Sequence, residues 1–549
     1  MSDSPSRTGG RILVDQLVAQ GCDRIFHVPG ESFLAVLDAL ADTPAIQTVT
    51  CRQEGGVSFM AEADGVMTGR PGIAFVTRGP GATNASIGVH VAMQDSVPMI
   101  LFIGDVASPM RDREGFQEVD LVAMFRPLAK WAARVDEAAR LPEYVARAYS
   151  TAMGGRPGPV VLALPEDMLT ETAVARDRPR VEPAPQGCDA GAIEQLSDLL
   201  ATAERPVAIV GGAGWNAVAS AAFADWAARA RVPVAAAFRR QDAVPNDCPA
   251  WAGNLGYGPN PKLVARVREA DLLLVVGARL GEATTDGYTV VTPDHPGQRL
   301  VHVHPDAQEL NRVYRTDLAI CADMASFAEA LLTVDDPAHG DGDAAHAEYL
   351  AWSTPAPRDL ALDLAQVVGH MRNVLPTDSV ICNGAGNFSG WWHRYWRYAG
   401  PVSQLAPTAG AMGYGVPAAV AAALRMPGRQ VIAVAGDGDF LMNGQELATA
   451  VQHGADMLVL VIDNAAYGTI RMHQEREYPG RVSGTELQNP DFAALARAYG
   501  AWAAVVERTD AFPDALAAAM RASGVRLLHL KTEVEAINAA TTLTAMRNR

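Results

Sequence analysis

Short apolar runs alternate with longer amphipathic stretches along the chain, and this alternation predicts the strands and helices of α/β domains. In the first part, residues 72–76 and 99–103 contain no polar side chain and residues 24–28 (RIFHV) are mostly apolar, as in strands buried within a parallel sheet. A stretch rich in Pro and charged residues, 176–191, predicts a linker after them. We therefore expect a doubly wound parallel-sheet domain over residues 1–175.

The same alternation occurs twice more. The apolar runs are residues 206–210, 271–276 and 299–303 in the middle, and 380–382, 430–435, 457–462 and 526–530 near the end, the last of which is expected to close its sheet. Residues 335–359 are rich in Asp, Ala, Gly, His and Pro, and predict a second linker. The predicted fold class is α/β, with three doubly wound parallel-sheet domains over residues 1–175, 190–335 and 358–549.

Composition restricts the kinds of partner that the chain can have. A net charge of −17 does not suit a nucleic-acid partner. The sequence has no uninterrupted apolar run of about 20 residues, as a membrane span requires, and residues 1–10 lack the apolar core of a signal peptide. The 6 cysteines form no C-x-x-C pair, which suits a reducing compartment. We expect a cytoplasmic protein with no nucleic-acid or membrane partner.

The sharpest chemical signal follows the apolar run 430–435. A Gly-Asp-Gly turn around Asp437 comes directly after this predicted strand, and Asn464 ends the next one, 27 positions later. Ligands in open α/β sheets bind at the carboxyl ends of the strands. Mg²⁺ takes oxygen ligands and often shares them with phosphate groups. A Gly-Asp-Gly turn alone is an ordinary connection, but with this spacing it predicts that Asp437, Asn464 and the carbonyl of Ala466 hold Mg²⁺ bound to a diphosphate.

With these motifs the sequence resembles the thiamine diphosphate enzymes of the acetolactate synthase (acetohydroxyacid synthase) group, over nearly the whole chain. The resemblance implies a pyrimidine-binding N-terminal domain, a Rossmann-like middle domain and a diphosphate-binding C-terminal domain. It also implies that Glu54, in the segment CRQEGG of residues 51–56, is the activating glutamate. A carboxyl hydrogen-bonded to N1′ of the aminopyrimidine favours the imino tautomer, whose nitrogen takes the proton from C2 of the thiazolium.

Further segments match the group, and the resemblance assigns roles to their residues. Met412 would wedge the cofactor into its bent conformation, and the carbonyl of Gly410 would accept from its 4′-amino group. Phe116 and Gln117 would line the approach to the active site, with Gln117 as a catalytic candidate. The other residues expected at the cofactor are Gly30, Asn84, Gly386, Asn387, Phe388, Gly438, Asp439, Tyr467 and Gly468.

Three positions depart from the group's pattern. His27 stands in the first loop where branched-chain synthases carry Tyr, and it could act as a catalytic acid or base near neutral pH. A core histidine with a satisfied hydrogen bond is an equal alternative. Thr469 and His473 stand where synthases of the amino-acid pathway carry Met and Trp, in the pocket for the acceptor substrate. The identity of the acceptor is therefore open.

The middle domain departs furthest from the group. Typical members bind FAD there through an Arg-Phe-Asp-Asp-Arg segment, whereas residues 279–283 read RLGEA. Residues 211–214 could still cradle a nucleotide, but a lone glycine cluster is weak evidence. The expected cofactors are thiamine diphosphate and Mg²⁺, with FAD a weaker alternative.

The leading hypothesis is a carboligase that decarboxylates a 2-oxo acid such as pyruvate and transfers the acyl anion to a carbonyl acceptor. A 2-oxo acid decarboxylase or a hydroxyketone lyase would use the same chemistry. From other classes, a flavin- or nicotinamide-linked oxidoreductase rests on residues 211–214 alone, and a non-catalytic cofactor-binding protein would not need Glu54. Because the group's geometry places Glu54 of one subunit opposite Asp437 of another, we expect a homodimer or homotetramer.

Overall fold

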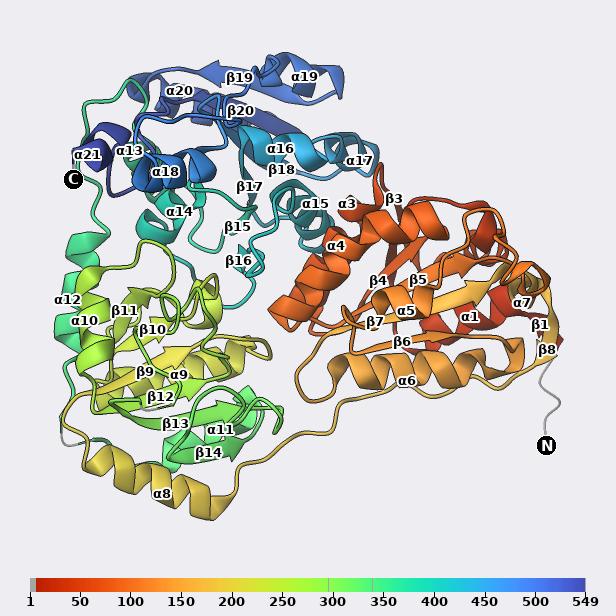
Figure 1. Ribbon diagram of the computed structural model, residues 1–549, viewed down its shortest axis with the longest axis horizontal. Coiled ribbons are helices and arrows are strands. Elements are labelled where there is room, and N and C mark those ends of the chain that lie inside the picture. Colours follow the sequence, from red (N-terminus) through yellow and green to blue (C-terminus); the bar gives the residue numbers. More distant parts are fainter. Residues whose placement is uncertain (1–5, 295, 338, 549) are drawn as a thin grey trace. The chain divides into compact units, whose positions relative to one another are not determined.

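The computed structural model describes residues 6–294, 296–337 and 339–548, and the fold is α/β (Figure 1). Three six-stranded sheets follow one another along the chain, and all of their strand pairs are parallel. A two-stranded antiparallel sheet joins β1 (Ser6–Thr8) to β8 (Thr172–Val174). The three parallel-sheet domains predicted from the apolar runs are therefore confirmed.

The first sheet has the strand order β3-β2-β4-β5-β7-β6, with β3 at one edge. Its central strands are buried along their whole length, which explains why their sequences are almost continuously apolar. The strands are β2 (Arg24–His27), β3 (Gln47–Thr50), β4 (Gly72–Val76), β5 (Met99–Asp105), β6 (Trp131–Arg134) and β7 (Pro159–Pro165). The helices are α1 (Gly9–Ala19), α2 (Leu34–Ala41), α3 (Glu54–Thr68), α4 (Gly79–Asp95), α5 (Leu121–Phe125), α6 (Leu141–Met153) and α7 (Glu166–Thr170).

The middle sheet has the order β11-β10-β9-β12-β13-β14. The strands are β9 (Pro206–Val210), β10 (Val234–Ala236), β11 (Trp251–Asn254), β12 (Leu272–Val276), β13 (Arg299–His304) and β14 (Leu318–Cys321). The helices are α8 (Ala190–Ala201), α9 (Ala217–Ala230), α10 (Pro261–Glu269), α11 (Met324–Ala330) and α12 (Gly342–Trp352).

The third sheet has the order β16-β15-β17-β18-β20-β19, so that β15, β17 and β18 lie next to one another. The strands are β15 (Val380–Asn383), β16 (Gln404–Leu405), β17 (Val431–Gly436), β18 (Met457–Asp463), β19 (Trp502–Val506) and β20 (Val525–Lys531). The helices are α13 (Leu364–Val374), α14 (Ser389–Tyr395), α15 (Gly415–Arg425), α16 (Asp437–Asn443), α17 (Glu446–Gln452), α18 (Gly468–Glu477), α19 (Phe492–Ala498), α20 (Phe512–Arg521) and α21 (Leu543–Arg547).

Packing groups the described residues into two compact units. The first unit holds the chain up to Ala184 together with Val416–Pro427 and Leu441–Ala455, which include α17 and most of α15. The second unit holds Pro185–Gly415, Gly428–Phe440 and the chain from Asp456 onward. In the first unit, Arg425 at the end of α15 donates to Asp64 at 2.8 Å and to Asp23 at 2.7 Å. Two segments that come after the third sheet has begun thus pack with the N-terminal domain.

Two details of the prediction need correction. The run 526–530 forms β20, but β19 lies outside it, so β20 does not close the sheet. The expected linker 335–359 contains α12, whose Tyr349 is buried and whose His346 lies 2.9 Å from the carbonyl of Trp251 on β11. This helix could not be recognised from the sequence, because its many Ala and polar residues are also common in linkers. Only one face of the helix is buried.

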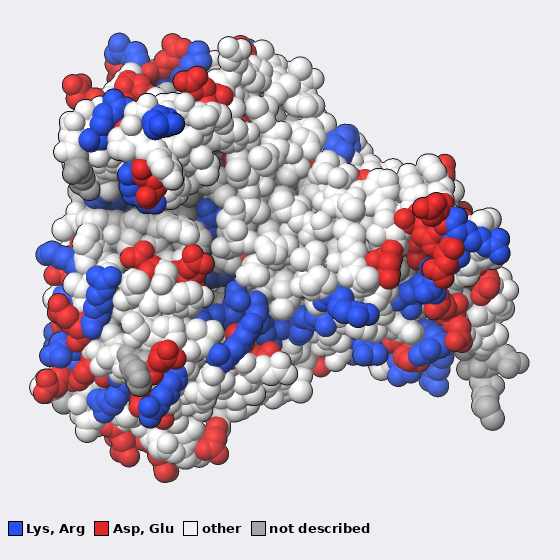
Figure 2. All heavy atoms as spheres, in the orientation of Figure 1, with Lys and Arg blue, Asp and Glu red and all other residues white. Residues whose placement is uncertain are grey.

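Charged side chains of both signs occur close together in several areas of the face drawn in Figure 2, and much of that face carries neither sign. Oppositely charged side chains pair in this chain, for example in Arg180–Glu182 and Arg266–Glu348. All six cysteines are free thiols. Within the described ranges, every helix is too short or too polar to cross a membrane.

Candidate active site

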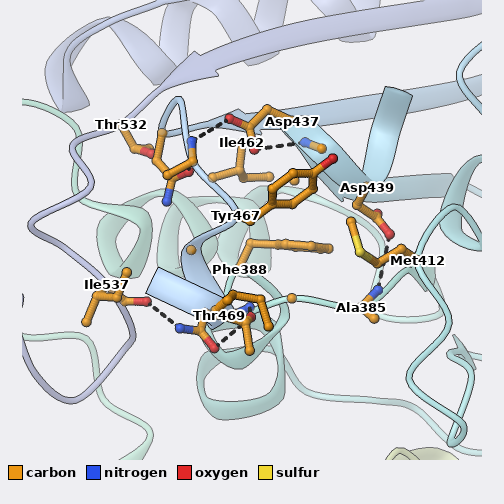
Figure 3. A pocket seen from close by; sticks show the side chains of 18 of the residues that line it. Ala385, Phe388, Met412, Asp437, Asp439, Ile462, Tyr467, Thr469, Thr532 and Ile537 are labelled. Atoms are coloured by element: carbon orange, nitrogen blue, oxygen red, sulfur yellow. Dashed lines mark hydrogen bonds between the residues drawn. The ribbon is translucent and has the colours of Figure 1, made fainter. Parts of the chain in front are cut away.

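A cavity of about 250 Å³ lies at the carboxyl edge of the third sheet (Figure 3). Three neighbouring strands supply its lining: β15 and β18 continue into turns, and β17 runs directly into α16, whose first residues line the cavity. Parallel strands end at the same edge, so turns that are distant in the sequence meet there. Predicted site residues that line the cavity are Gly386, Asn387, Phe388, Gly410, Met412, Asp437, Gly438, Asp439, Asn464, Ala466, Tyr467, Gly468 and Thr469.

Asp437 is held in a fixed orientation directly after β17. It is 3% exposed, and its Oδ1 accepts from the N–H of Gly438 at 2.9 Å. Its Oδ2 accepts from Asn489 at 2.8 Å and from the N–H of Ala466 at 3.3 Å. Burial raises the pKa of Asp437 to about 6, against the hydrogen bonds from Gly438 and Asn489. A bound cation would favour the charged carboxylate.

Asn464 and Ala466 complete a donor set made of oxygen atoms. Asn464 Oδ1 accepts from the N–H of Ala466 at 3.2 Å, and Ala465 between them adopts a left-handed conformation with φ of 54°. The turn therefore places Asn464 and Ala466 on the cavity that Asp437 lines. One carboxylate, one amide oxygen and one carbonyl are ligands that suit Mg²⁺ shared with a diphosphate. These residues fit the predicted metal.

The glycines of this edge are required by close packing. A Cβ on Gly438 would lie 2.5 Å from the ring of Tyr467. A Cβ on Gly386 would lie 2.7 Å from the ring of Phe388. These distances are shorter than carbon atoms can approach, so both turns need glycine to come this close to the aromatic side chains.

Asp439, in the first turn of α16, accepts hydrogen bonds from the loop at Gly413 and from the turn after β15. It is 3% exposed, and its Oδ1 accepts from the N–H of Gly413 at 2.7 Å and of Ala385 at 3.2 Å. Its Oδ2 is buried without a hydrogen-bond partner among the described residues. Burial raises the pKa of Asp439 to about 7, although both N–H groups oppose this. The side chain fixes the Gly410–Met412 loop relative to the turns after β15 and β17.

Asn387 has its side-chain amide engaged by the protein. Its Oδ1 accepts from the hydroxyl of Thr469 at 3.1 Å, and its Nδ2 donates to the carbonyl of Ile537 at 3.0 Å. Its predicted contact with the diphosphate stays a prediction.

His473 is not among the residues that line this cavity, and its Nδ1 lies 2.9 Å from a guanidinium nitrogen of Arg476. Of the two departures on α18, only Thr469 lines the cavity.

Glu54 lies in the first unit, at the first residue of α3. Its Oε2 accepts from Nδ2 of Asn84 at 2.9 Å. Asn84 on α4 therefore orients the predicted activating carboxyl. A Cβ on Gly30 would lie 2.5 Å from Cβ of Thr77, so this predicted cofactor residue allows the first loop to pack against the end of β4.

His27 is enclosed in the first sheet. It is 6% exposed, and its Nε2 lies 3.3 Å from Oγ1 of Thr50. Burial lowers the pKa of His27 to about 4, with a further contribution from His453. The ring is therefore neutral at physiological pH. Its Nδ1 is buried without a hydrogen-bond partner among the described residues, so the ring is not the fully satisfied core histidine of the alternative interpretation. The catalytic role of His27 stays a prediction.

Phe116 and Gln117 lie on the loop before α5. Phe116 is 75% exposed, and the guanidinium carbon of Arg78 lies 5.9 Å from its ring centre. Gln117 has φ of 64°, and its carbonyl accepts from the N–H of Gly79 at 3.0 Å. A left-handed backbone at a residue other than glycine costs of order 1 kcal/mol and is often found at functional sites. Their predicted roles stay predictions.

Comparison with known proteins identifies the family. The chain matches three family models, described as the "Thiamine pyrophosphate enzyme, N-terminal TPP binding domain" (residues 7–124), the "central domain" (193–331) and the "C-terminal TPP binding domain" (384–530). The chain belongs to the thiamine pyrophosphate enzymes. Its sequence is 32% identical over 512 residues to an acetolactate synthase large subunit of Parasynechococcus marenigrum, covering 90% of this chain and 82% of that protein.

Two other relatives give the same picture. The acetolactate synthase large subunit of Lactococcus lactis is 31% identical over 511 residues, covering 90% of this chain and 87% of the relative. The acetolactate synthase isozyme 2 large subunit of Escherichia coli is 29% identical over 531 residues, covering 96% and 95%. The predicted resemblance to the acetolactate synthase group is thus confirmed at the level of family.

The structure adds a network that sequence reasoning missed in this thiamine pyrophosphate enzyme. Asn489 Nδ2 donates both to Asp437 and to Asp463, at 2.8 Å each. His529 is buried on β20, and its Nε2 donates to Asp463 at 2.8 Å. In the sequence, the only indication of this network was the Asp463-Asn464 pair at the end of β18. Asn489 comes from a loop that no local pattern connects to the turn.

We predict that Asn489→Ala weakens Mg²⁺ binding about 10- to 100-fold, the usual effect of removing a group that orients a metal ligand. The two carboxylates that Asn489 bridges would then repel each other without an intervening donor. Calorimetric titration of Mg²⁺ in the presence of saturating thiamine diphosphate measures the change. Gln488→Ala, at the exposed neighbouring position, is the control and should bind as the wild type does. Equal affinity in both variants would show that Asn489 does not orient Asp437.

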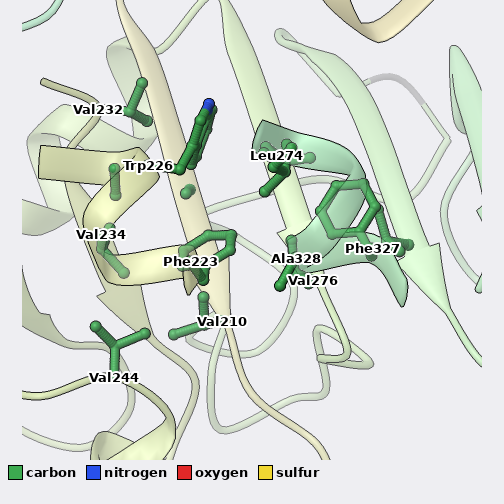
Figure 4. Packing of buried hydrophobic residues seen from close by; sticks show 14 of the residues in the cluster. Val210, Phe223, Trp226, Val232, Val234, Val244, Leu274, Val276, Phe327 and Ala328 are labelled. Atoms are coloured by element: carbon green, nitrogen blue, oxygen red, sulfur yellow. The ribbon is translucent and has the colours of Figure 1, made fainter. Parts of the chain in front are cut away.

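The glycine cluster of the middle domain is explained by packing. A Cβ on Gly212 would lie 2.0 Å from the carbonyl oxygen of Gly277, and one on Gly211 would lie 2.7 Å from Cβ of Ala237. Trp215 donates to the carbonyl of Gly211 at 2.9 Å. Phe223, Trp226 and Val210 belong to one buried hydrophobic cluster in the domain's core (Figure 4). These contacts account for the glycines, and the FAD alternative gains no support from them.

Proposed function

We propose that this thiamine pyrophosphate enzyme is an Mg²⁺-dependent carboligase of acetolactate synthase type. It decarboxylates a 2-oxo acid such as pyruvate and transfers the acyl group to a carbonyl acceptor. The observation that carries the proposal is the oxygen donor set of Asp437, Asn464 and Ala466 on one cavity. The chain aligns with relatives that are named acetolactate synthase large subunits over most of their length, and this similarity supports the reaction type.

In this proposal, residues at the edge of the third sheet bind the cofactor and its metal, and Glu54 takes part in proton transfer. Asp437, Asn464 and the carbonyl of Ala466 would hold Mg²⁺, and Met412 with the Gly410 loop would support the cofactor beside them. Bound thiamine diphosphate supplies an electron sink for the negative charge that remains when CO₂ leaves. Glu54 holds a proton at the aminopyrimidine nitrogen, and Asn84 orients its carboxyl.

The oligomeric state belongs to the same proposal. Glu54 and Asp437 belong to different compact units of the chain. In the related group, one active site combines these two residues from different subunits. We therefore propose a homodimer or homotetramer, with small-molecule substrates.

A substrate panel tests the proposed reaction. We expect the Mg²⁺–thiamine diphosphate form to release CO₂ from pyruvate or another small 2-oxo acid. With an aldehyde acceptor it should form a hydroxyketone, and with a second 2-oxo acid as acceptor a 2-hydroxy-3-oxo acid. Coupled CO₂ detection and mass spectrometry of the products measure both steps. CO₂ release with a free aldehyde as the only product would identify a decarboxylase instead. Cleavage of an added hydroxyketone without CO₂ release would identify a lyase, and inertness toward the whole panel would refute the proposal.

A further inference from the structure

The connection from β3 to α3 lacks a sheet partner on one side, because β3 is an edge strand that pairs with β2 among the described residues. Its backbone N–H groups must find other acceptors when they are buried. Glu446 on α17 and His453, the residue that follows this helix, supply them within the first unit. Thr50 donates to Nε2 of His453 at 3.0 Å, and Arg52 and Gln53 donate to Oε1 of Glu446 at 3.1 and 3.0 Å.

The side chain of Glu446 is buried against this connection. Its side chain is 0% exposed, and its Oε2 accepts from the hydroxyl of Thr449 at 2.6 Å. A Cβ on Gly56 would lie 2.6 Å from Oε1 of Glu446, so the first turn of α3 needs glycine to accommodate the carboxylate. A buried carboxylate is costly unless several donors satisfy it, and here two backbone N–H groups and one hydroxyl do so.

The residue that follows these two N–H groups is Glu54. Its backbone position is therefore set by Glu446 through Arg52 and Gln53, and its carboxyl is set by Asn84 on α4. Catalytic groups must be held within about 0.5 Å of their working position by supporting contacts. A short stretch of chain joins Glu446 to Asp437, so the segment that carries the metal ligand also carries the support for the activating turn.

We propose that Glu446 is a positioning residue for Glu54, acting through the backbone of Arg52 and Gln53. This inference rests on the proposed function, in which Glu54 activates the cofactor. It assigns to α17 a role in catalysis that neither its sequence pattern nor the metal-binding turn before it indicates.

Glu446→Gln tests the proposal, because it keeps the shape of the side chain but replaces one acceptor by a donor. In the cofactor-free protein, we expect amide hydrogen exchange of residues 50–56 to become about tenfold faster, as the loss of about one hydrogen bond's stabilisation predicts. In the loaded enzyme, we expect exchange of the cofactor's C2 proton for deuterium, and turnover, to fall together by about 100-fold. Affinity for Mg²⁺–thiamine diphosphate should stay within about threefold of the wild type, because the metal ligands are untouched.

Gln452→Ala is the matched control. Gln452 lies on the same helix, and among the described residues its side chain accepts from the side chain of Arg52 rather than from the backbone N–H groups. Its removal should therefore leave all of these measurements within about twofold. Should Glu446→Gln fail to fold, Thr449→Val removes the hydroxyl that holds the carboxylate and should slow C2 exchange several-fold. Unchanged C2 exchange in the variant that folds would overturn the positioning role. A wild-type protein that neither binds the cofactor nor exchanges its C2 proton would overturn the proposed function, and the positioning role with it.

Discussion

Glu54→Gln is expected to bind Mg²⁺–thiamine diphosphate as the wild type does and to lose 10²- to 10⁴-fold in turnover, the usual contribution of a positioned acid or base. The amide can still accept a hydrogen bond from Asn84, so the turn at the start of α3 should keep its structure. It cannot supply the proton that favours the imino tautomer of the aminopyrimidine. Steady-state kinetics, together with a binding titration on the same preparation, separates turnover from cofactor affinity.

Glu171→Gln is the control for this experiment, since Glu171 is exposed and its backbone N–H and carbonyl form hydrogen bonds with Asp167 and Gly9. It should be as active as the wild type. Wild-type turnover in Glu54→Gln would remove the activating role and would leave the chain without an identified acid. Loss of cofactor binding in Glu54→Gln would instead assign Glu54 to binding.

Asp437→Ala is expected to lose cofactor affinity by more than the 10- to 100-fold that removal of an orienting residue causes, because it would remove a proposed metal ligand itself. The substitution also leaves the donors of Gly438, Ala466 and Asn489 without their acceptor. Turnover should disappear at cofactor concentrations that saturate the wild type and should recover in part at much higher Mg²⁺. Activity measured over a matrix of Mg²⁺ and thiamine diphosphate concentrations reveals this dependence.

Asp359→Ala is the control, because Asp359 is an exposed carboxylate far from Asp437 in the sequence. Its activity over the same Mg²⁺ and thiamine diphosphate concentrations should equal that of the wild type. A similar loss in both variants would indicate a general destabilisation. An Asp437→Ala variant with wild-type Mg²⁺ dependence would exclude this turn as the metal site.

The sequence was sufficient for the features that are local in the chain. Residues 72–76 and 206–210 became β4 and β9 without a shift, because strands buried on both faces must be apolar at every position. Asp437 and Asn464 could be placed on one edge because each directly follows a strand, and neighbouring parallel strands end at the same edge.

Non-local packing was beyond the sequence. Nothing in residues 446–452 indicates that this helix packs with the N-terminal domain, because its pattern is that of an ordinary short helix between two strands of the third sheet. Asn489 and His529 reach Asp437 and Asp463 from a loop and from a separate strand, and neither position carries a motif. Polar side chains that support a site from a distance are found only once the chain is folded.

Asn387 shows the limit of assigning roles by resemblance. Its turn has the composition expected of a diphosphate contact, and it does line the cavity. Its amide, however, is bound by Thr469 and by the carbonyl of Ile537. A matching residue type at a matching place can therefore serve the protein's own framework, which only the hydrogen-bond partners reveal.

The most direct test of the account is calorimetric titration of thiamine diphosphate into the protein with and without Mg²⁺. The arrangement of Asp437, Asn464 and Ala466 predicts saturable binding that requires Mg²⁺ and that Asp437→Ala abolishes over the same concentration range. Binding that is independent of Mg²⁺, or the absence of binding by the wild-type protein, would contradict it.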